Sequence, residues 1–406
     1  MVKSILDEAV MLELELMRVP FRSVQNLETA LLDAEERTVR RIRRERPEST
    51  DVIGKQRRRN LLNEINGYYE EPFKEYESKL LADITERSGL AYESTGVALS
   101  SHYAVIKGEK IAKAFDTIPI VALKRITDPE MPLVGSGLLK DEVKTLGIKT
   151  QTRVRRVVAS GLVTGASNDE MQREIRNSAR ITNKEARSLA RTATATAMNE
   201  ARQEALKPFK REDIITGYEW IAVLDMRVTF GCASLNGIVR KRVEDFPMIP
   251  RHFNCRSVIM PRTILSDDET ETRPFTIHDE RKVKHRDVVR EDGTRIDGGS
   301  STRYSIPRHK AGEKKGEIIK SRRGDVTLKR PVKGSKKSIG DNWLEHLEGK
   351  GQGPWIRKYF GEVRYKLWKK EGLGFHDLID HKDLSPLSVK EIKRRINRKG
   401  FKGVRE

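Results

Sequence analysis

The spacing of apolar residues predicts helices through the first part of the chain. Apolar positions recur every three or four residues in 1–18, 23–45 and 57–87, which is the period of an amphipathic helix. Pro20 ends the first segment and Pro72 interrupts the third, because proline cannot continue a helix. The apolar stripes are narrow, so these segments are predicted to be long antiparallel helices or helices that contact a partner.

Residues 133–207 contain no proline and form the strongest helical region. Ser167 with Glu170, and Thr182 with Glu185, fit the capping-box pattern that begins a helix. The second of these helices carries alanines at spacings of four, three, four and four, namely Ala186, Ala190, Ala193, Ala197 and Ala201. Such a stripe of small residues lets a neighbouring element approach closely, and the module that follows is the predicted neighbour.

The pattern changes to that of strands after residue 217. Aromatic and β-branched residues in 217–224 predict a buried strand. The pair Asn236-Gly237 favours a two-residue hairpin turn of type I′, since both residues tolerate positive φ. Residues 255–261 predict a last short strand that Pro261 ends. A small sheet covered by the alanine-striped helix follows from these features.

Residues 262–340 lose all periodicity and indicate a basic, loop-rich linker, partly disordered, with one short strand at 316–320 or 325–329. Apolar residues at helical spacing return near Asn342, and Ser388 with Glu391 caps a final basic helix.

The predicted fold class is α+β. It comprises a mostly helical N-terminal half, a small β-containing Cys/His module, a basic loop-rich linker and a small basic helical C-terminal domain. The predicted boundaries are 1–149, 150–261, 262–340 and 341–406.

Composition narrows the class of protein. Apolar residues make up 36% and charged residues 34%, which favours extended or partner-dependent segments. No run of about 18 apolar residues occurs, so no membrane span is expected, and the N-terminus lacks a signal-peptide pattern. Two cysteines among 406 residues indicate a reducing compartment without a structural disulfide.

The net charge of +20 is unevenly distributed. Residues 281–340 hold 19 Lys and Arg against 7 acids, and residues 341–406 hold 16 against 10, whereas the first 280 residues are nearly balanced at 45 against 43. This asymmetry predicts a polyanion partner, with a charged, solvated tail as the alternative. The candidate DNA-binding residues are Arg322, Arg323, Lys329, Arg330, Lys333, Lys336, Lys337, Lys393, Arg394 and Arg395.

Cys232, His252 and Cys255 are candidate ligands of one structural zinc ion, with Asp225 as the candidate fourth ligand. The alternative is a metal-free knot in which the thiols are buried and Asp225 pairs with nearby arginines. The other histidines are scattered, and residues such as His102 and His309 are predicted to lie on the surface.

An enzyme is the less favoured interpretation. Asp225, His252 and Asn254 superficially resemble His-Asn-His nucleases, but the second histidine and the later asparagine that such sites need are not in place. A Cys232 nucleophile with His252 as base would lack an orienting group and an oxyanion hole. No catalytic residue is therefore assigned.

One motif set resembles a known family. It runs from a Trp-led strand through Asp-x-Arg, a Cys and a Gly turn to Pro-x-His-x-x-Cys-Arg and a closing Pro. In this chain these residues are Trp220, Asp225, Arg227, Cys232, Gly237, Pro250, His252, Cys255, Arg256 and Pro261. The helix upstream, with Asn199 and Arg202, also fits, although Val228 stands where a Thr is common. The pattern resembles the phage Mu F-like minor head proteins, also called head morphogenesis proteins, over 150–261 and weakly over 355–395.

The resemblance implies a non-enzymatic minor capsid protein of a tailed phage, at the portal vertex or in the capsid interior. Its implied partners are the portal protein, capsid or scaffolding proteins and double-stranded DNA bound without sequence preference during packaging or delivery. It would reside in the virion, and in the host cytoplasm during assembly. Two alternatives stay open: a metal-dependent DNA-processing enzyme built on the Cys/His module, and a neck component that never touches DNA.

Overall fold

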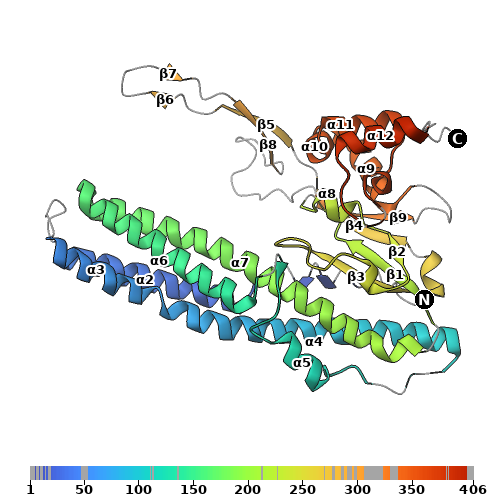
Figure 1. Ribbon diagram of the computed structural model, residues 1–406, viewed down its shortest axis with the longest axis horizontal. Helices are drawn as coiled ribbons and strands as arrows, with labels where there is room; N and C mark the ends of the chain where they lie inside the picture. Colours follow the sequence, from blue (N-terminus) through green and yellow to red (C-terminus); the bar gives the residue numbers. More distant parts are fainter. Residues whose placement is uncertain are drawn as a thin grey trace, which may run out of the picture. The chain divides into compact units, whose positions relative to one another are not determined.

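The computed structural model (Figure 1) describes residues 5–399 with gaps. The residues not described within that range are 6–8, 10–11, 14, 17–19, 47–53, 110, 112–113, 135–136, 212–213, 226, 269, 277–278, 285–287, 290–294, 297–299, 306–322, 330–336, 381 and 383. The chain forms two compact units. One comprises Met1–Val10, Ile215–Pro247 and Ser257–Glu406, and the other comprises Met11–Ile214 and Met248–Arg256.

The second unit is a bundle of long helices. Its elements are α2 (Arg22–Glu45), α3 (Lys55–Tyr68), α4 (Glu71–Lys107), α5 (Ile120–Ile126), α6 (Leu139–Thr164), α7 (Asn168–Leu206) and the 3-10 helix η2 (Lys207–Arg211). Helix α7 has 39 residues, which is about 58 Å at 1.5 Å per residue. It packs against α2, α4 and α6, and Figure 1 shows these helices lying lengthwise beside one another.

Most of the predicted helices are confirmed. The segment 23–45 is α2, the described residues of 1–18 are helical, and the third segment breaks just before Pro72, between α3 and α4. The capping box at Ser167 also begins a helix as predicted. The second predicted box is wrong, because Thr182 lies inside α7: its hydroxyl donates to Ser178 O (3.0 Å) and contacts Thr150 Oγ1 (2.8 Å).

The interior of the bundle combines small residues with paired polar groups. All five alanines of the predicted stripe are fully buried. Ser23 donates to the buried Asp83 carboxylate from both its backbone N (2.9 Å) and its Oγ (2.6 Å). The Tyr76 hydroxyl donates to Ala186 O (2.8 Å), which ties α4 to α7. These contacts fix how the long helices align, because each requires one particular register.

The other unit contains a three-stranded antiparallel sheet in the order β2-β1-β3, formed by β1 (Ile215–Ala222), β2 (Val239–Arg240) and β3 (Ser257–Thr263). The strand predicted at 217–224 is confirmed as β1, which is the central strand. Pro261 does not end β3 as predicted but pairs with Tyr218 inside it. An edge strand accepts proline because its outer side needs no ladder hydrogen bond.

The Asn236-Gly237 turn also differs from its prediction. Only Gly237 has positive φ (84°), so this is no type I′ turn, and β1 and β2 are joined by a longer connection that contains α8 (Phe230–Ala233). The Asn236 side chain instead accepts a hydrogen bond from Ala222 N (2.8 Å), and Gly237 N donates to Trp220 O (2.9 Å).

Residues 262–340 contain more regular structure than their sequence predicts. After the 3-10 helix η4 (Ile264–Asp268), the strands pair into three separate two-stranded antiparallel sheets. The pairs are β4 (Thr270–Thr276) with β9 (Arg323–Lys329), β5 (Asp279–Lys284) with β8 (Ser300–Ser305), and β6 (Val288–Val289) with β7 (Arg295–Ile296). The strand predicted at 325–329 falls in β9, and 316–320 lies outside the described residues.

The C-terminal helices belong to the same unit as the sheet. They are α9 (Ile339–Gly349), α10 (Gly353–Phe360), α11 (Glu362–Glu371), the 3-10 helix η5 (Phe375–Leu378) and α12 (Val389–Lys399). The Phe230 ring of α8 lies 5.5 Å from the Phe360 ring and 5.9 Å from the Phe375 ring. His376 Nε2 lies 3.0 Å from Asn236 O. The predicted α+β fold is therefore confirmed. No helix within the described part of the chain is apolar over a length that could cross a membrane.

Candidate metal centre

Cys232 is placed by a single helical turn that follows the central strand. Strand β1 continues into the buried Val223 and Leu224, and the chain then turns at Asp225, whose Oδ1 accepts a hydrogen bond from Arg227 N (2.8 Å). Thr229 caps α8 by accepting a hydrogen bond from Cys232 N (3.3 Å) on its side chain. The cap fixes the backbone of Cys232, whose side chain is buried.

His252 and Cys255 are placed by a tight turn between the 3-10 helix η3 (Val243–Asp245) and β3. Cys255 N donates to His252 O (3.0 Å), and Asn254 adopts a positive φ of 59° between them. Two hydrogen bonds hold Asn254: its backbone N donates to Thr192 Oγ1 (3.0 Å) and its Nδ2 donates to Ser188 Oγ (2.6 Å). This bonding offsets the strain of a left-handed residue, which asparagine tolerates better than most.

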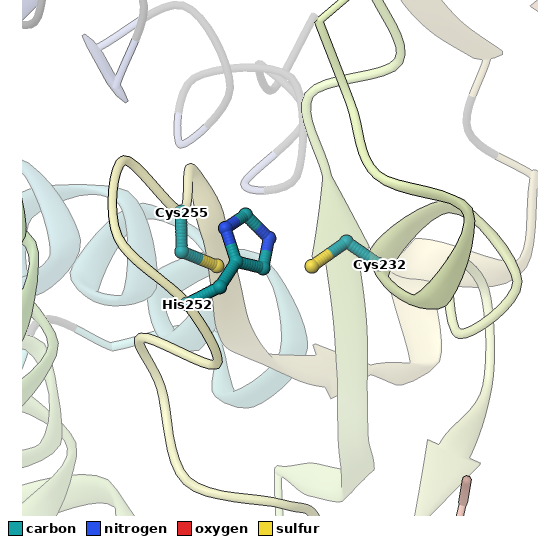
Figure 2. Close-up of side chains that lie close together, drawn as sticks. All are labelled: Cys232, His252 and Cys255. Atoms are coloured by element: carbon teal, nitrogen blue, oxygen red, sulfur yellow. The ribbon is translucent and has the colours of Figure 1, made fainter. Parts of the chain in front are cut away.

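The structure brings Cys232, His252 and Cys255 together. One ligand atom from each, a thiol sulfur or a ring nitrogen, lies within 4.8 Å of the other two. Figure 2 shows both sulfur atoms turned toward the imidazole ring. Ligands of a tetrahedral zinc ion are separated by about 3.5–3.8 Å, given bonds of about 2.0–2.3 Å. The three residues therefore fit a zinc ion after a small contraction.

The electrostatic surroundings of His252 agree with this grouping. Its hydrogen bond to Cys255 raises the pKa of the imidazole, while partial burial opposes the shift. Its Nδ1 lies 2.9 Å from Phe253 O, which further raises the pKa. The turn thus holds a thiol and an imidazole in direct contact, an arrangement that serves either a metal or a metal-free knot.

Asp225, the predicted fourth ligand, does not belong to the group of converging atoms. Its carboxylate is engaged in the turn with Arg227 N. A different group lies near Cys232: the Tyr359 hydroxyl of α10, whose pKa burial raises well above its usual value, with the negative charges of Cys232 and Asp225 adding to the shift. The Tyr359 oxygen is buried and has no hydrogen-bond partner among the described residues.

A second buried feature lies beside Cys255. Arg202 of α7 pairs with Glu13 at 3.0 Å, and both side chains are only 1% exposed. Burial raises the pKa of Glu13, Arg202 opposes this, and the charges of Cys255 and Arg256 also act on Glu13. Arg202 is part of the sequence motif set, whereas Glu13 was not predicted. The signal available was an acid next to Leu12 within the apolar pattern of 1–18.

The remaining predicted residues fare differently. His102 is buried, contrary to prediction, and His309 lies outside the described residues. The two cysteines form no disulfide. Among the candidate DNA-binding residues, four lie outside the described residues, namely Arg322, Arg330, Lys333 and Lys336.

The other candidate DNA-binding residues lie on regular elements or beside them. Arg323 and Lys329 are in β9, and Arg395 is in α12 with Lys393 and Arg394. Lys337 pairs with Glu345 (2.8 Å) and Arg394 with Glu391 (3.0 Å). No single cluster of these side chains is defined within the described part of the chain.

These features define a Cys/His cluster formed by α8, which follows the central strand β1, and by the turn before β3. Residues 152–260 match the family model described as phage Mu protein F like protein. That segment, about a quarter of the chain, is therefore similar to the phage Mu F-like family, as its motifs predicted. No curated protein and no solved structure matches the chain.

Proposed function

We propose that this protein is a minor head protein of a tailed phage that acts in head assembly at the portal vertex. The observation that carries the proposal is the family match over 152–260. The motif residues within it build one structure: Trp220 is buried in the central strand, Cys232 follows in α8, and His252 and Cys255 form the turn before β3. Portal, capsid and scaffolding proteins are the proposed protein partners.

The proposed role includes contact with packaged DNA through the basic C-terminal third. Lys337, Lys393 and Arg394 are exposed, and no base-reading motif accompanies them, so binding would go to phosphates without sequence preference. The protein would reside in the virion, and in the host cytoplasm during assembly.

The assembly role is tested in the phage with the full-length chain. Truncating the N-terminal helices is a poor test, because α2 packs against α4 and α7 and its loss would unfold the bundle. An amber mutant should yield few infectious particles with abnormal heads. The protein should be present in wild-type virions and should co-purify with co-expressed portal. Normal infectious heads from the mutant would contradict the proposal.

The Cys/His cluster is proposed to hold one structural zinc ion. Two thiols and an imidazole suit zinc, and Tyr359 supplies an unpartnered buried hydroxyl close to Cys232. Metal analysis of the purified protein should give about one zinc per chain, and Cys232→Ser and Cys255→Ser should remove it. Asp225→Asn is the matched control and should keep its zinc. Zinc-free wild-type protein of undiminished stability would favour the metal-free knot.

The alternative of a nuclease is favoured only by the number of ligands, since catalytic zinc sites keep three protein ligands and an open position. Among the residues that the structure describes, no second histidine that could act as a general base joins the cluster. Zinc-loaded protein is expected to nick supercoiled plasmid no faster than Cys255→Ser. Faster, metal-dependent nicking by the wild type would establish the enzyme instead.

A further inference from the structure

One end of the bundle gathers four helix ends that are far apart in the sequence. Here α2 ends and α3 begins, and α6 ends and α7 begins (Figure 1). Three contacts tie these ends together. Arg43 pairs with Asp169 (3.2 Å), Arg46 donates to Ala166 O (3.1 Å), and Arg57 lies 3.6 Å from Glu45.

This end is rich in basic residues, and nearly all of them are arginines. We define the arginine-rich end as residues 37–46, 55–60 and 153–176, which contain fourteen Arg, one Lys and four acids. The first 280 residues are nearly neutral in total, so their net charge does not reveal the positive charge that folding gathers at this end of the bundle. In contrast, residues 281–340 hold nine Arg and ten Lys.

Several of these arginines are not used to hold the fold together. Some are paired with acids, such as Arg41 with Glu64 (2.7 Å) and Arg176 with Glu35 (2.8 Å). Others are exposed and form no ion pair with an acid among the residues that the structure describes. One such arginine is found on each of the four helices: Arg44, Arg59, Arg155 and Arg173.

The first turn of α3 runs against what helix stability favours. It contains Lys55, Arg57 and Arg58, no acid, and Gly54 gives no side-chain cap. The N-terminus of a helix carries partial positive charge, so cations there are unfavourable and anions are favourable. A bound polyanion would remove this conflict, because it would meet both the backbone N–H groups and the guanidinium groups.

We propose that the arginine-rich end is a contact surface for duplex DNA, separate from the basic C-terminal third. Neighbouring helix axes lie about 10 Å apart, so the cations are spread over a surface and cannot converge on one small anion. A duplex presents a charge about every 1.7 Å of its axis and can engage all of them. Arginine binds phosphate through two parallel hydrogen bonds, which explains the preference over lysine.

An acidic protein is the less suitable partner. Protein interfaces have an apolar centre, and within the described residues of the arginine-rich end Val163 is the one large apolar side chain that is strongly exposed. The arginine-rich end would give the proposed head protein a second DNA surface. Binding of DNA at this end does not depend on whether the C-terminal third binds DNA.

The test measures binding of full-length protein to a random-sequence duplex over a salt series. The end variant is Arg44→Gln, Arg59→Gln, Arg155→Gln and Arg173→Gln combined. The control variant removes the same charge from exposed lysines of the bundle outside the arginine-rich end, as Lys107→Gln, Lys124→Gln, Lys144→Gln and Lys210→Gln. All eight positions are exposed, so both variants should keep the helical circular dichroism of the wild type.

The end variant should bind more weakly, and the slope of log affinity against log salt should become shallower by about 2 to 4, at roughly 0.9 for each phosphate that is no longer neutralised. The control slope should change by less than about 1. Equal changes in the two variants, or an unchanged end variant, would overturn the proposal. An end variant that keeps DNA affinity but no longer co-purifies with portal would assign the surface to a protein.

A third variant tests the C-terminal third separately, with Lys337→Gln, Lys393→Gln and Arg394→Gln combined. If that variant alone loses DNA affinity, the arginine-rich end is not a DNA surface and the DNA contact of the C-terminal third stands. If only the end variant loses affinity, the C-terminal contact of the proposed function fails and the arginine-rich end is the DNA surface.

Discussion

The contacts of α7 with its neighbours in the bundle and the core of the C-terminal helices rest on different interactions. Helix α7 presents buried alanines, and its neighbours are aligned by polar contacts such as the Arg202–Glu13 pair (3.0 Å). The C-terminal helices stack aromatic rings, with Trp343 and Trp355 at 6.1 Å and Phe360 and Phe375 at 5.2 Å between ring centroids.

The difference separates two sources of stability. Alanine-lined helices approach closely but bury little apolar area per residue, so directional contacts decide their alignment. Aromatic side chains bury much larger areas and tolerate several ring arrangements. Removing one partner of a buried ion pair in the bundle should therefore leave an unpaired charge. Removing an aromatic ring among the C-terminal helices should leave a cavity.

The two cores can be followed separately in one chain. All four tryptophans, Trp220, Trp343, Trp355 and Trp368, lie in the unit that contains the sheet and the C-terminal helices. Tryptophan fluorescence therefore reports on that unit, and far-ultraviolet circular dichroism is dominated by the long helices of the bundle.

The largest effect is expected from Phe375→Ala. This fully buried ring contacts Phe230 and Phe360. Its removal should lower the free energy of unfolding of the unit that contains the C-terminal helices by about 3–5 kcal/mol, because apolar burial is lost and a cavity is left. Denaturant unfolding monitored by fluorescence checks it. Val363→Ala, at a position 41% exposed, is the control and should change stability by less than about 0.5 kcal/mol. Similar destabilisation in the two variants would mean that the aromatic cluster is not a core.

The corresponding change in the bundle is Arg202→Met, which leaves the buried Glu13 without its partner. We expect a decrease of about 3 kcal/mol in the free energy of unfolding, monitored by circular dichroism. The double variant Glu13→Leu/Arg202→Met should recover most of it, because neither charge is then buried alone. If the loss of stability in the double variant equals the sum of the losses in Glu13→Leu and Arg202→Met, the two residues are not energetically coupled. The two units would then not differ in this way.

Sequence patterns predicted the helices and the central strand well, because apolar periodicity reports directly on which face is buried. They failed where a tertiary contact overrides a local signal. Thr182 has the form of a helix start, yet its hydroxyl is used against Thr150 within a continuous helix. Asn236 has the form of a hairpin turn, yet its side chain accepts a hydrogen bond from Ala222 N.

The candidate site was predictable in its ligands and not in its surroundings. Cys232, His252 and Cys255 carry their chemistry in their identity, and the short distance from His252 to Cys255 along the chain favours a shared turn. Glu13 and Tyr359 are more than a hundred residues away from Cys232, so nothing local connects them with it. The same limit hid the arginine-rich end, which exists only once four helix ends meet.

Two capping boxes allow a smaller comparison between the units. Ser338 caps α9 and bonds the buried Asp341 carboxylate through Oγ (2.7 Å), whereas the Ser167 box on α7 is exposed. Ser338→Ala should destabilise its unit by about 2 kcal/mol, and Ser167→Ala by less than half of that. Each is measured with the probe of its own unit. Equal effects would show that burial of the cap does not matter.

The pH dependence of Ser338→Ala sharpens this result. Burial raises the pKa of Asp341, while the hydrogen bonds from Ser338 and Phe375 N oppose the shift. A carboxyl with a raised pKa binds more protons in the folded state, so stability falls as pH rises above the unfolded value of about 3.9. Removing the Ser338 hydroxyl raises the pKa further. The loss of stability in Ser338→Ala relative to the wild type should therefore be larger at pH 7 than at pH 4. A loss that is independent of pH would exclude Asp341 as its source.

The smallest expected effect comes from removing one hydroxyl in each unit. The Tyr76 hydroxyl in the bundle donates to Ala186 O, whereas the Tyr359 oxygen has no partner among the described residues, although both are buried. Tyr76→Phe leaves a buried carbonyl without its donor and should cost about 1 kcal/mol by circular dichroism. In zinc-free protein, Tyr359→Phe removes an unsatisfied polar atom and should leave the fluorescence transition within about 0.5 kcal/mol of the wild type or slightly more stable. A clear destabilisation by Tyr359→Phe that is seen with zinc-loaded and not with zinc-free protein would show that this hydroxyl is bonded within the metal centre. The core of the C-terminal helices would then depend on directional contacts in the same way as the contacts of α7 in the bundle.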